Sequence, residues 1–176
     1  MKQYFRIIAT FTALLFIALG AGIAHQKFSP APAKDHAVQQ LWALKLKDSQ
    51  GKEQALQQWQ GKIIVLNFWA TWCKPCVQEM PELQALHQEL QTKNVQLLGI
   101  GIDSPSNISE FTQKHQISYP LFAAGMEGTA LSQSLGNQVG GLPYTALIDQ
   151  NGKIAKTYMG RLNIEELRRD ILNLLK

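Results

Sequence analysis

A pair of cysteines placed between a buried strand and a helix constrains the fold of this chain more than any other feature. Cys73 and Cys76 are the only two cysteines among its 176 residues. The apolar run 63–69 before them is typical of a central strand that is buried on both faces. Residues 76–90 after them carry apolar side chains at helical spacing. The sequence therefore predicts a strand, a CxxC loop and a helix in succession.

Strand-like and helix-like segments alternate along the rest of the chain, which indicates an α/β domain. Turn signals and apolar periodicity predict a hairpin over 42–56, strands over 95–102 and 119–122, a second hairpin over 144–158 and a last helix over 164–175. We expect a mixed central β-sheet flanked by helices, with an N-terminal β-hairpin extension. Folded structure should begin near Leu41.

The N-terminus has the pattern of an export signal. Lys2 and Arg6 precede the uncharged apolar segment 7–24. By the positive-inside rule this order places the rest of the chain outside the cytoplasm, on the periplasmic side of the inner membrane. We favour an uncleaved anchor over a removed signal peptide. A Pro/Ala-rich linker over 25–40 would then connect the anchor to the folded domain over 41–176.

The charge of the chain gives no sign of a nucleic-acid partner. Lys and Arg number 17 against 13 Asp and Glu, which gives a net charge of +4. These charges are scattered, whereas a nucleic-acid binder carries a clustered basic stripe. We therefore expect no nucleic-acid binding.

The position of the cysteines favours a redox role. Cys73 should lie at the start of the helix, where unpaired backbone N–H groups and the helix dipole lower a thiol pKa. Cys76, about one turn on, is placed to resolve a mixed disulfide formed by Cys73. Pro75 suits the first helical turn because its missing N–H costs nothing there. Lys74 either favours the thiolate further or simply faces solvent.

Three structural roles for the motif fit the sequence less well. A zinc site needs four ligands, and the chain offers no further cysteine and only isolated histidines such as His87 and His115. A c-type haem needs histidine directly after Cys76, where Val77 stands. A static disulfide over so short a loop would add little stability. We expect neither a metal nor a cofactor.

Three other functions remain as alternatives. A peroxidase is the weakest, because the usual Pro-x-x-x-Thr/Ser-x-x-Cys pattern is absent around Cys73. The two thiolates could instead hold Cu(I) in a metal-handling or client-binding assembly factor. An oxidase that donates disulfides is also compatible, because potentials of CxxC proteins span roughly −270 to −120 mV.

Pro143 precedes a predicted strand and has two interpretations. A cis Leu142–Pro143 bond would place a tight turn opposite the CxxC motif and leave the Leu142 backbone free to pair with a substrate peptide. An ordinary trans proline at a strand edge fits the sequence as well.

The motif and its surroundings resemble the TlpA/ResA-like family of exported, membrane-anchored thiol–disulfide oxidoreductases. The resemblance rests on the run Asn67–Cys76 and on Glu79-Met80-Pro81. Weaker matches between Gly51-Lys52 and Gly152-Lys153 fall in the same order as in the family. It implies a thioredoxin-like fold, with Cys73 as nucleophile, Cys76 as resolving thiol and Pro143 as a cis-proline facing them. It also implies a membrane electron donor of the DsbD/CcdA type. Implied clients are exported disulfide-containing proteins of cytochrome c maturation or copper-site assembly.

One position departs from thioredoxin in an informative way. Thioredoxin has a buried aspartate where this chain has Asn67, and asparagine does not titrate. Glu79, three residues after Cys76, resembles the acidic residue usual in the family. We hypothesise that Glu79 tunes the pKa of Cys76 or handles its proton. A purely structural carboxylate at the start of a helix is an equal alternative.

Overall fold

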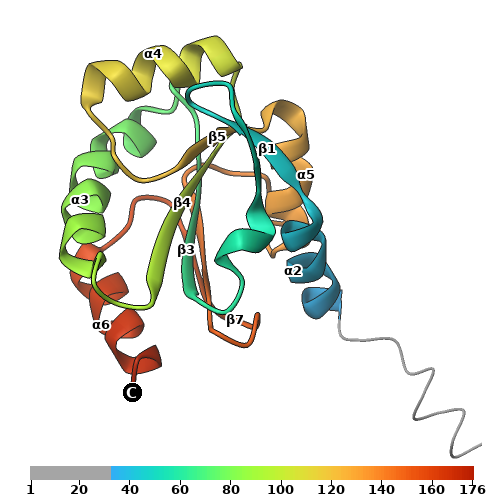
Figure 1. The fold of residues 1–176 in the computed structure, drawn as a ribbon, viewed down its shortest axis with the longest axis vertical. Coiled ribbons are helices and arrows are strands. Elements are labelled where there is room, and N and C mark those ends of the chain that lie inside the picture. The colour runs from blue at the N-terminus through green and yellow to red at the C-terminus, as the bar shows by residue number, and fades with distance from the viewer. Residues whose placement is uncertain (1–32) are drawn as a thin grey trace, which may run out of the picture. The chain divides into compact units, whose positions relative to one another are not determined.

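The computed structural model describes residues 33–176, and Figure 1 draws these residues as a coloured ribbon. The anchor expected over 7–24 lies outside the described residues. Among the helices of residues 33–176, none is both long and apolar enough to cross a membrane.

One mixed sheet of seven strands forms the centre of the fold, in the order β2-β1-β5-β4-β3-β6-β7. The strands are β1 Lys45–Asp48, β2 Glu53–Ala55, β3 Ile63–Trp69, β4 Val95–Gly101, β5 Leu121–Ala123, β6 Tyr144–Ile148 and β7 Ile154–Met159. Strand β3 pairs parallel with β4 and antiparallel with β6. The predicted mixed sheet and both hairpins are confirmed.

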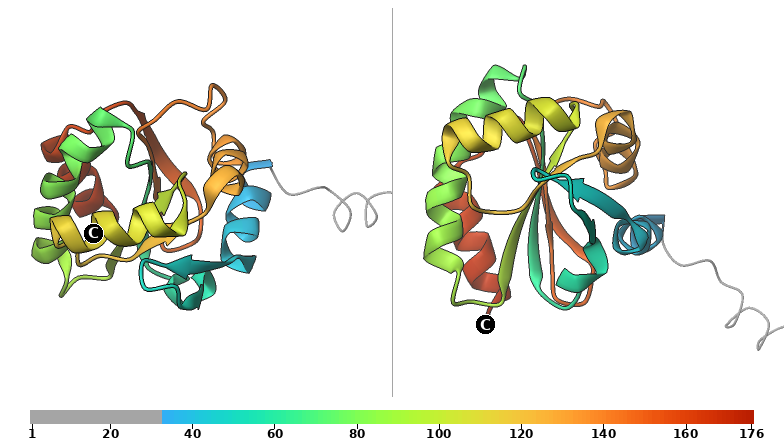
Figure 2. Two further views of the ribbon diagram at one scale, coloured as in Figure 1. Left: turned by 90° about the horizontal axis from the view of Figure 1, so that it is seen from above. Right: turned by 45° about the horizontal axis from the view of Figure 1, so that its top comes forward.

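Helices cover both faces of the sheet. They are α2 Ala33–Ala43, α3 Lys74–Leu90, α4 Pro105–His115, α5 Gly125–Ser134 and α6 Ile164–Leu174, with a 3₁₀ turn η1 over Leu56–Trp59. Figures 1 and 2 show α3, α4 and α6 on one side and α2 and α5 on the other. This arrangement is the expected thioredoxin-like fold.

Strand β3 explains why its sequence is an almost unbroken apolar run. All of its residues are buried. Val65 and Trp69 belong to the apolar cluster under α3, α4 and α6. Leu66 and Phe68 point to the opposite cluster, under α2 and α5. Because helices cover both faces, neither set of side chains meets solvent.

The folded domain begins earlier than we expected. Helix α2 starts at Ala33, not near Leu41, so residues 33–40 are helical and do not belong to the linker. Val38 and Leu41 on this helix are buried against the sheet. The Pro/Ala-rich composition suggested a tether, but this apolar face gives the segment a packing partner. Trp42, expected in the first strand, also lies in α2.

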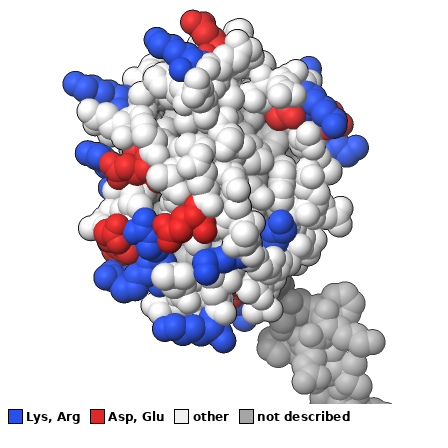
Figure 3. All heavy atoms as spheres, turned by 60° about the vertical axis from the view of Figure 1, so that its left-hand side comes forward, with Lys and Arg blue, Asp and Glu red and all other residues white. Residues whose placement is uncertain are grey.

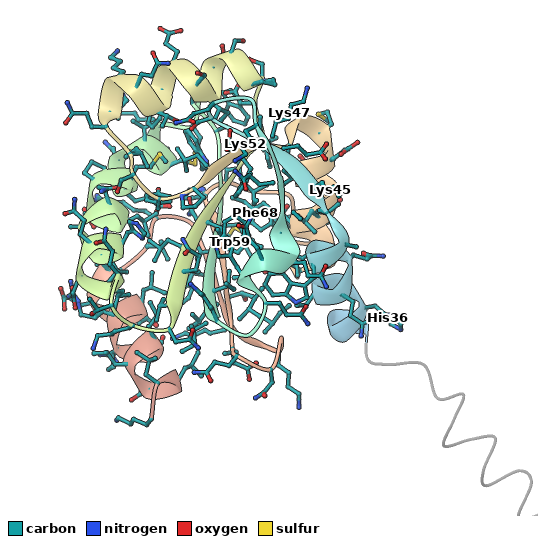
Figure 4. All side chains as sticks on the ribbon, in the orientation of Figure 1. His36, Lys45, Lys47, Lys52, Trp59 and Phe68 are labelled. Carbon is teal, nitrogen blue, oxygen red and sulfur yellow. A yellow bond between two sulfur atoms is a disulfide. The ribbon has the colours of Figure 1, made fainter. Side chains whose placement is uncertain are left out.

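The hairpin β1–β2 completes one edge of the sheet. Strand β1 pairs antiparallel with β5, and Trp59 of η1 packs edge-on against Phe122 of β5 at 5.6 Å between ring centroids. Figure 4 shows Lys45, Lys47 and Lys52 on this hairpin. On the face shown in Figure 3, acidic and basic side chains are interspersed.

Candidate functional site

The two cysteines form a disulfide at the N-terminus of α3. Their sulfur atoms are 2.02 Å apart. Cys73 is the N-cap of the helix, and its Sγ accepts a hydrogen bond from the Cys76 backbone N–H at 3.4 Å. Cys73 retains 6 % exposure, whereas Cys76 has none. The predicted strand, CxxC loop and helix are therefore present, and Cys73 is the less buried of the two cysteines.

Contacts from the loop between β4 and α4 hold the CxxC loop in place. The backbone N–H of Thr71 donates to the Asp103 carboxylate at 3.2 Å, and the Thr71 hydroxyl donates to the same oxygen. Asp103 also accepts from the Ser104 N–H at the start of α4. Burial opposes ionisation of Asp103, but the hydrogen bonds from Thr71 and from Asn107 hold the pKa of its carboxyl below the usual value. Thr71 thereby ties the CxxC loop to Asp103, whose carboxylate also accepts from the Asn107 side chain of α4.

Sequence reasoning did not assign a role to either member of this pair. A usable signal exists, because Thr71 follows strand β3 and Asp103 follows strand β4. These two strands are parallel neighbours, so their carboxyl ends meet at one edge of the sheet. Polar residues directly after adjacent parallel strands are therefore candidates for contact.

Pro143 lies at the same end of the sheet as the disulfide. It precedes β6, which runs antiparallel to β3, so the start of β6 lies beside the end of β3. The Leu142–Pro143 peptide bond is cis. The Pro143 carbonyl accepts a hydrogen bond from the Gly160 N–H at 2.9 Å, which joins this turn to the end of β7.

Exposed apolar side chains occur on the CxxC loop and around the Pro143 turn. Trp72, next to Cys73, is 68 % exposed, and Val139 and Met159 are also exposed. Val139 lies in the segment that leads to Pro143 and Met159 ends β7, and both side chains lie close to Gly141. A hollow of about 380 Å³ is lined by Thr71, Val77, Asn107, Glu110, Phe111, Lys114 and His115. Lys74 is exposed to solvent.

Glu79 is fully buried on α3 and belongs to a polar network. Its Oε1 accepts from the Asn67 side-chain amide at 2.9 Å, and its Oε2 accepts from the Leu162 backbone N–H at 2.9 Å. The Asn67 amide also donates to the Thr145 hydroxyl at 3.0 Å. Burial raises the pKa of the Glu79 carboxyl, and the two hydrogen bonds and the Arg161 charge partly offset this effect. The sequence indicated Glu79 and Asn67 but assigned no role to Thr145 or Leu162.

No group of three or more His, Cys, Asp or Glu side chains between residues 33 and 176 is arranged to hold a metal ion.

Comparisons with known proteins agree with this geometry. The model of the AhpC/TSA family matches residues 37–157. The thiol-disulfide oxidoreductase ResA of Geobacillus thermodenitrificans is 33 % identical over 127 residues, which cover 72 % of this chain and 71 % of the relative. ResA of Halalkalibacterium halodurans is 26 % identical over 176 residues, covering 99 % of this chain and 97 % of the relative.

A solved structure shows the same fold. It is a thiol:disulfide interchange protein of the thioredoxin family from Chlorobium tepidum. The two structures have a TM-score of 0.68 at 22 % sequence identity, covering 76 % of this chain and 93 % of that one.

Proposed function

Because this chain belongs to the AhpC/TSA family and is a thiol–disulfide oxidoreductase, we propose that it reduces disulfides in exported client proteins. One observation carries the assignment of roles. Cys73, at the helix N-terminus, keeps 6 % of its surface exposed, whereas Cys76 is completely buried. A client sulfur therefore has access to Cys73, which is the nucleophile, and Cys76 is the resolving thiol.

The reaction proceeds in two exchanges. In the reduced protein the Cys73 thiolate attacks one sulfur of the client disulfide, and the other client sulfur leaves as a thiolate that takes up a proton. Cys76 then loses its proton and attacks Cys73, which breaks the mixed disulfide and releases the second client thiolate. Two electrons have passed to the client, and the Cys73–Cys76 disulfide remains.

Local structure supports the reactivity of both thiols. The free N–H groups at the start of α3 stabilise the Cys73 thiolate. The carboxylate of Glu79, on the same helix as Cys76, has a pKa raised by burial and is therefore a stronger base than an exposed glutamate. We propose that Glu79 takes the proton of Cys76 when the mixed disulfide is resolved.

The client binds across the loops that surround the disulfide. Leu142 and Pro143 lie opposite the CxxC loop, where an extended client segment pairs with the backbone of this turn. Trp72 and Met159 supply apolar contact area beside it. Clients of this kind are disulfide-containing proteins of cytochrome c maturation or copper-site assembly.

The oxidised protein then needs a source of electrons outside the cytoplasm. We propose that residues 7–24 anchor the chain in the inner membrane with its folded domain in the periplasm. A membrane electron donor of the DsbD/CcdA type reduces the Cys73–Cys76 disulfide there. This proposal rests on the charge pattern of the N-terminus and on the family resemblance.

Trapping with cysteine variants tests this assignment. A Cys76→Ser variant retains the nucleophile and lacks the resolving thiol, so it should accumulate mixed disulfides with clients through Cys73. The matched Cys73→Ser variant should accumulate far less. Mass spectrometry of the trapped species identifies the client and the linked cysteine. Equal trapping by both variants, or trapping through Cys76 alone, would reject the assigned roles.

A further inference from the structure

A buried amide connects the carboxyl group of Glu79 to the hydroxyl group of Thr145. Both N–H groups of the Asn67 amide are used, one toward Glu79 at 2.9 Å and one toward Thr145 at 3.0 Å. The Asn67 Oδ1 atom has no hydrogen-bond partner. All three side chains are at most 2 % exposed. These three side chains are therefore shielded from bulk water.

The fold fixes the positions of these three residues. Asn67 and Thr145 are directly opposite each other in the β3–β6 pair, so their side chains share one face of the sheet. Helix α3 covers that face and carries Glu79. The Leu162 N–H holds the other carboxyl oxygen, Oε2, at 2.9 Å. Only Oε1 faces the amide of Asn67.

In its present orientation, the Asn67 amide suits only the ionised form of Glu79. A carboxylate oxygen accepts from the amide N–H, as observed. If Oε1 gains a proton, an O–H donor would face an N–H donor, which is unfavourable in a buried site. A half-turn of the amide exchanges nitrogen and oxygen at nearly constant shape. Oδ1 then accepts from the Glu79 O–H and from the Thr145 hydroxyl, which serves as donor or acceptor.

We propose that Asn67 is a positioning residue whose amide turns over when Glu79 gains or loses its proton. This inference rests on the proposed role of Glu79 as the proton acceptor for Cys76. The turnover provides a hydrogen-bond partner for both forms of the carboxyl group, and in the turned form the Asn67 amide nitrogen takes the position where Oδ1 now has no partner. It also transmits the protonation state to Thr145, two residues after Pro143. Asn67 thus serves proton transfer without titrating.

Other ionisable groups near Glu79 do not replace it in this role. Arg161 and Glu82 act on its carboxyl electrostatically, but they pair with each other at 2.6 Å at the surface. Burial, and secondarily the charge of Glu79, raise the pKa of the Tyr119 hydroxyl far above its usual value. Tyr119 therefore stays neutral while Glu79 titrates.

Nuclear magnetic resonance of the oxidised protein tests the turnover without depending on enzymatic activity. The carboxyl carbon of Glu79 reports its protonation as the pH is varied. Contacts between the Asn67 Nδ2 protons and the Thr145 side chain report the orientation of the amide. We expect these contacts to be lost on acidification. The pH at which half of them are lost should equal the midpoint of the Glu79 titration. Contacts that persist unchanged through that midpoint would overturn the proposal.

A Glu79→Gln variant gives an independent test. With the glutamine oxygen held by the Leu162 N–H, its amide nitrogen faces Asn67 as a permanent donor. At every pH, the Asn67 amide of this variant should then show the contacts that the wild type shows at low pH. The high-pH contact pattern of the wild type in this variant would contradict the turnover.

The same variant separates this inference from the proposed function. Unchanged cysteine pKa values and an unchanged exchange rate in Glu79→Gln would reject the role of Glu79 as a proton acceptor. The orientation of Asn67 is a separate result, because it is measured in the resting disulfide form.

Discussion

Replacing Glu79 by glutamine removes one ionisable proton from the core with little change in side-chain shape. In the wild type the ionised carboxyl is fully buried and accepts hydrogen bonds from Asn67 and from the Leu162 N–H. Glutamine resembles the protonated acid, because it has one carbonyl oxygen and one donor. The variant should therefore fold, and its stability should differ from that of the wild type mainly in its dependence on pH.

The sign of this difference follows from the shifted pKa. Burial raises the pKa of Glu79 above the ordinary value of 4.5, so the folded protein binds this proton more tightly than the unfolded chain. The contribution of this proton to the free energy of unfolding is fully present below pH 4.5. It is lost as the pH rises from 4.5 to the folded-state pKa of Glu79. One proton changes the free energy of unfolding by at most about 1.4 kcal/mol per pH unit, so the total loss is that figure multiplied by the shift.

Urea unfolding of the oxidised protein at a series of pH values between 4 and 8 measures this loss. The wild type should lose stability relative to Glu79→Gln as the pH rises, and the two curves should run parallel above the folded-state pKa. A control Glu110→Gln variant removes an exposed carboxylate of α4 that does not act on Glu79, and it should leave the pH dependence close to that of the wild type. Parallel curves for wild type and Glu79→Gln at all pH values would refute the raised pKa.

Three further substitutions test the fold around the site, each by urea unfolding. A β-carbon on Gly99 would come within 2.3 Å of the Leu121 Cδ2 atom, so Gly99→Ala should cost about 1–3 kcal/mol, and an unchanged midpoint would contradict this packing. Tyr144→Phe removes the 2.8 Å hydrogen bond to the Leu135 carbonyl and should cost about 1–2 kcal/mol; a neutral result would show that the bond contributes nothing. Asp103→Ala should destabilise the protein at pH values above 3.8, the ordinary pKa of aspartate, and the difference should shrink as the wild-type carboxyl is protonated at lower pH. A loss of stability that does not depend on pH would argue against a lowered pKa of Asp103.

Local sequence signals predicted much of the fold because they depend on nearby residues. The apolar run of β3 is buried on both faces, and turn residues such as Gly152 mark the hairpins. The apolar run before the cysteines and the helical spacing after them predicted that Cys73 lies at the junction of strand and helix. Each of these features is determined within a few positions along the chain, where periodicity and turn chemistry are readable.

The rest depended on contacts that the sequence does not encode locally. Thr145 meets Asn67 only because β6 returns beside β3 in one particular register. Leu162 contributes a backbone N–H, which no side-chain pattern reveals. Helix α2 starts before the predicted boundary because Val38 and Leu41 form an apolar face that packs on the sheet, a feature that the Pro/Ala-rich composition of the segment does not indicate.

The reduction potential of the Cys73–Cys76 pair tests the central claim most directly. Equilibration of the protein with a defined thiol–disulfide buffer gives this value for both cysteines together. A reductase of client disulfides should have a potential near that of thioredoxin, about −270 mV, below the glutathione couple. A value close to that of the strong oxidant DsbA, about −120 mV, would contradict the reductase assignment and identify the protein as a disulfide donor.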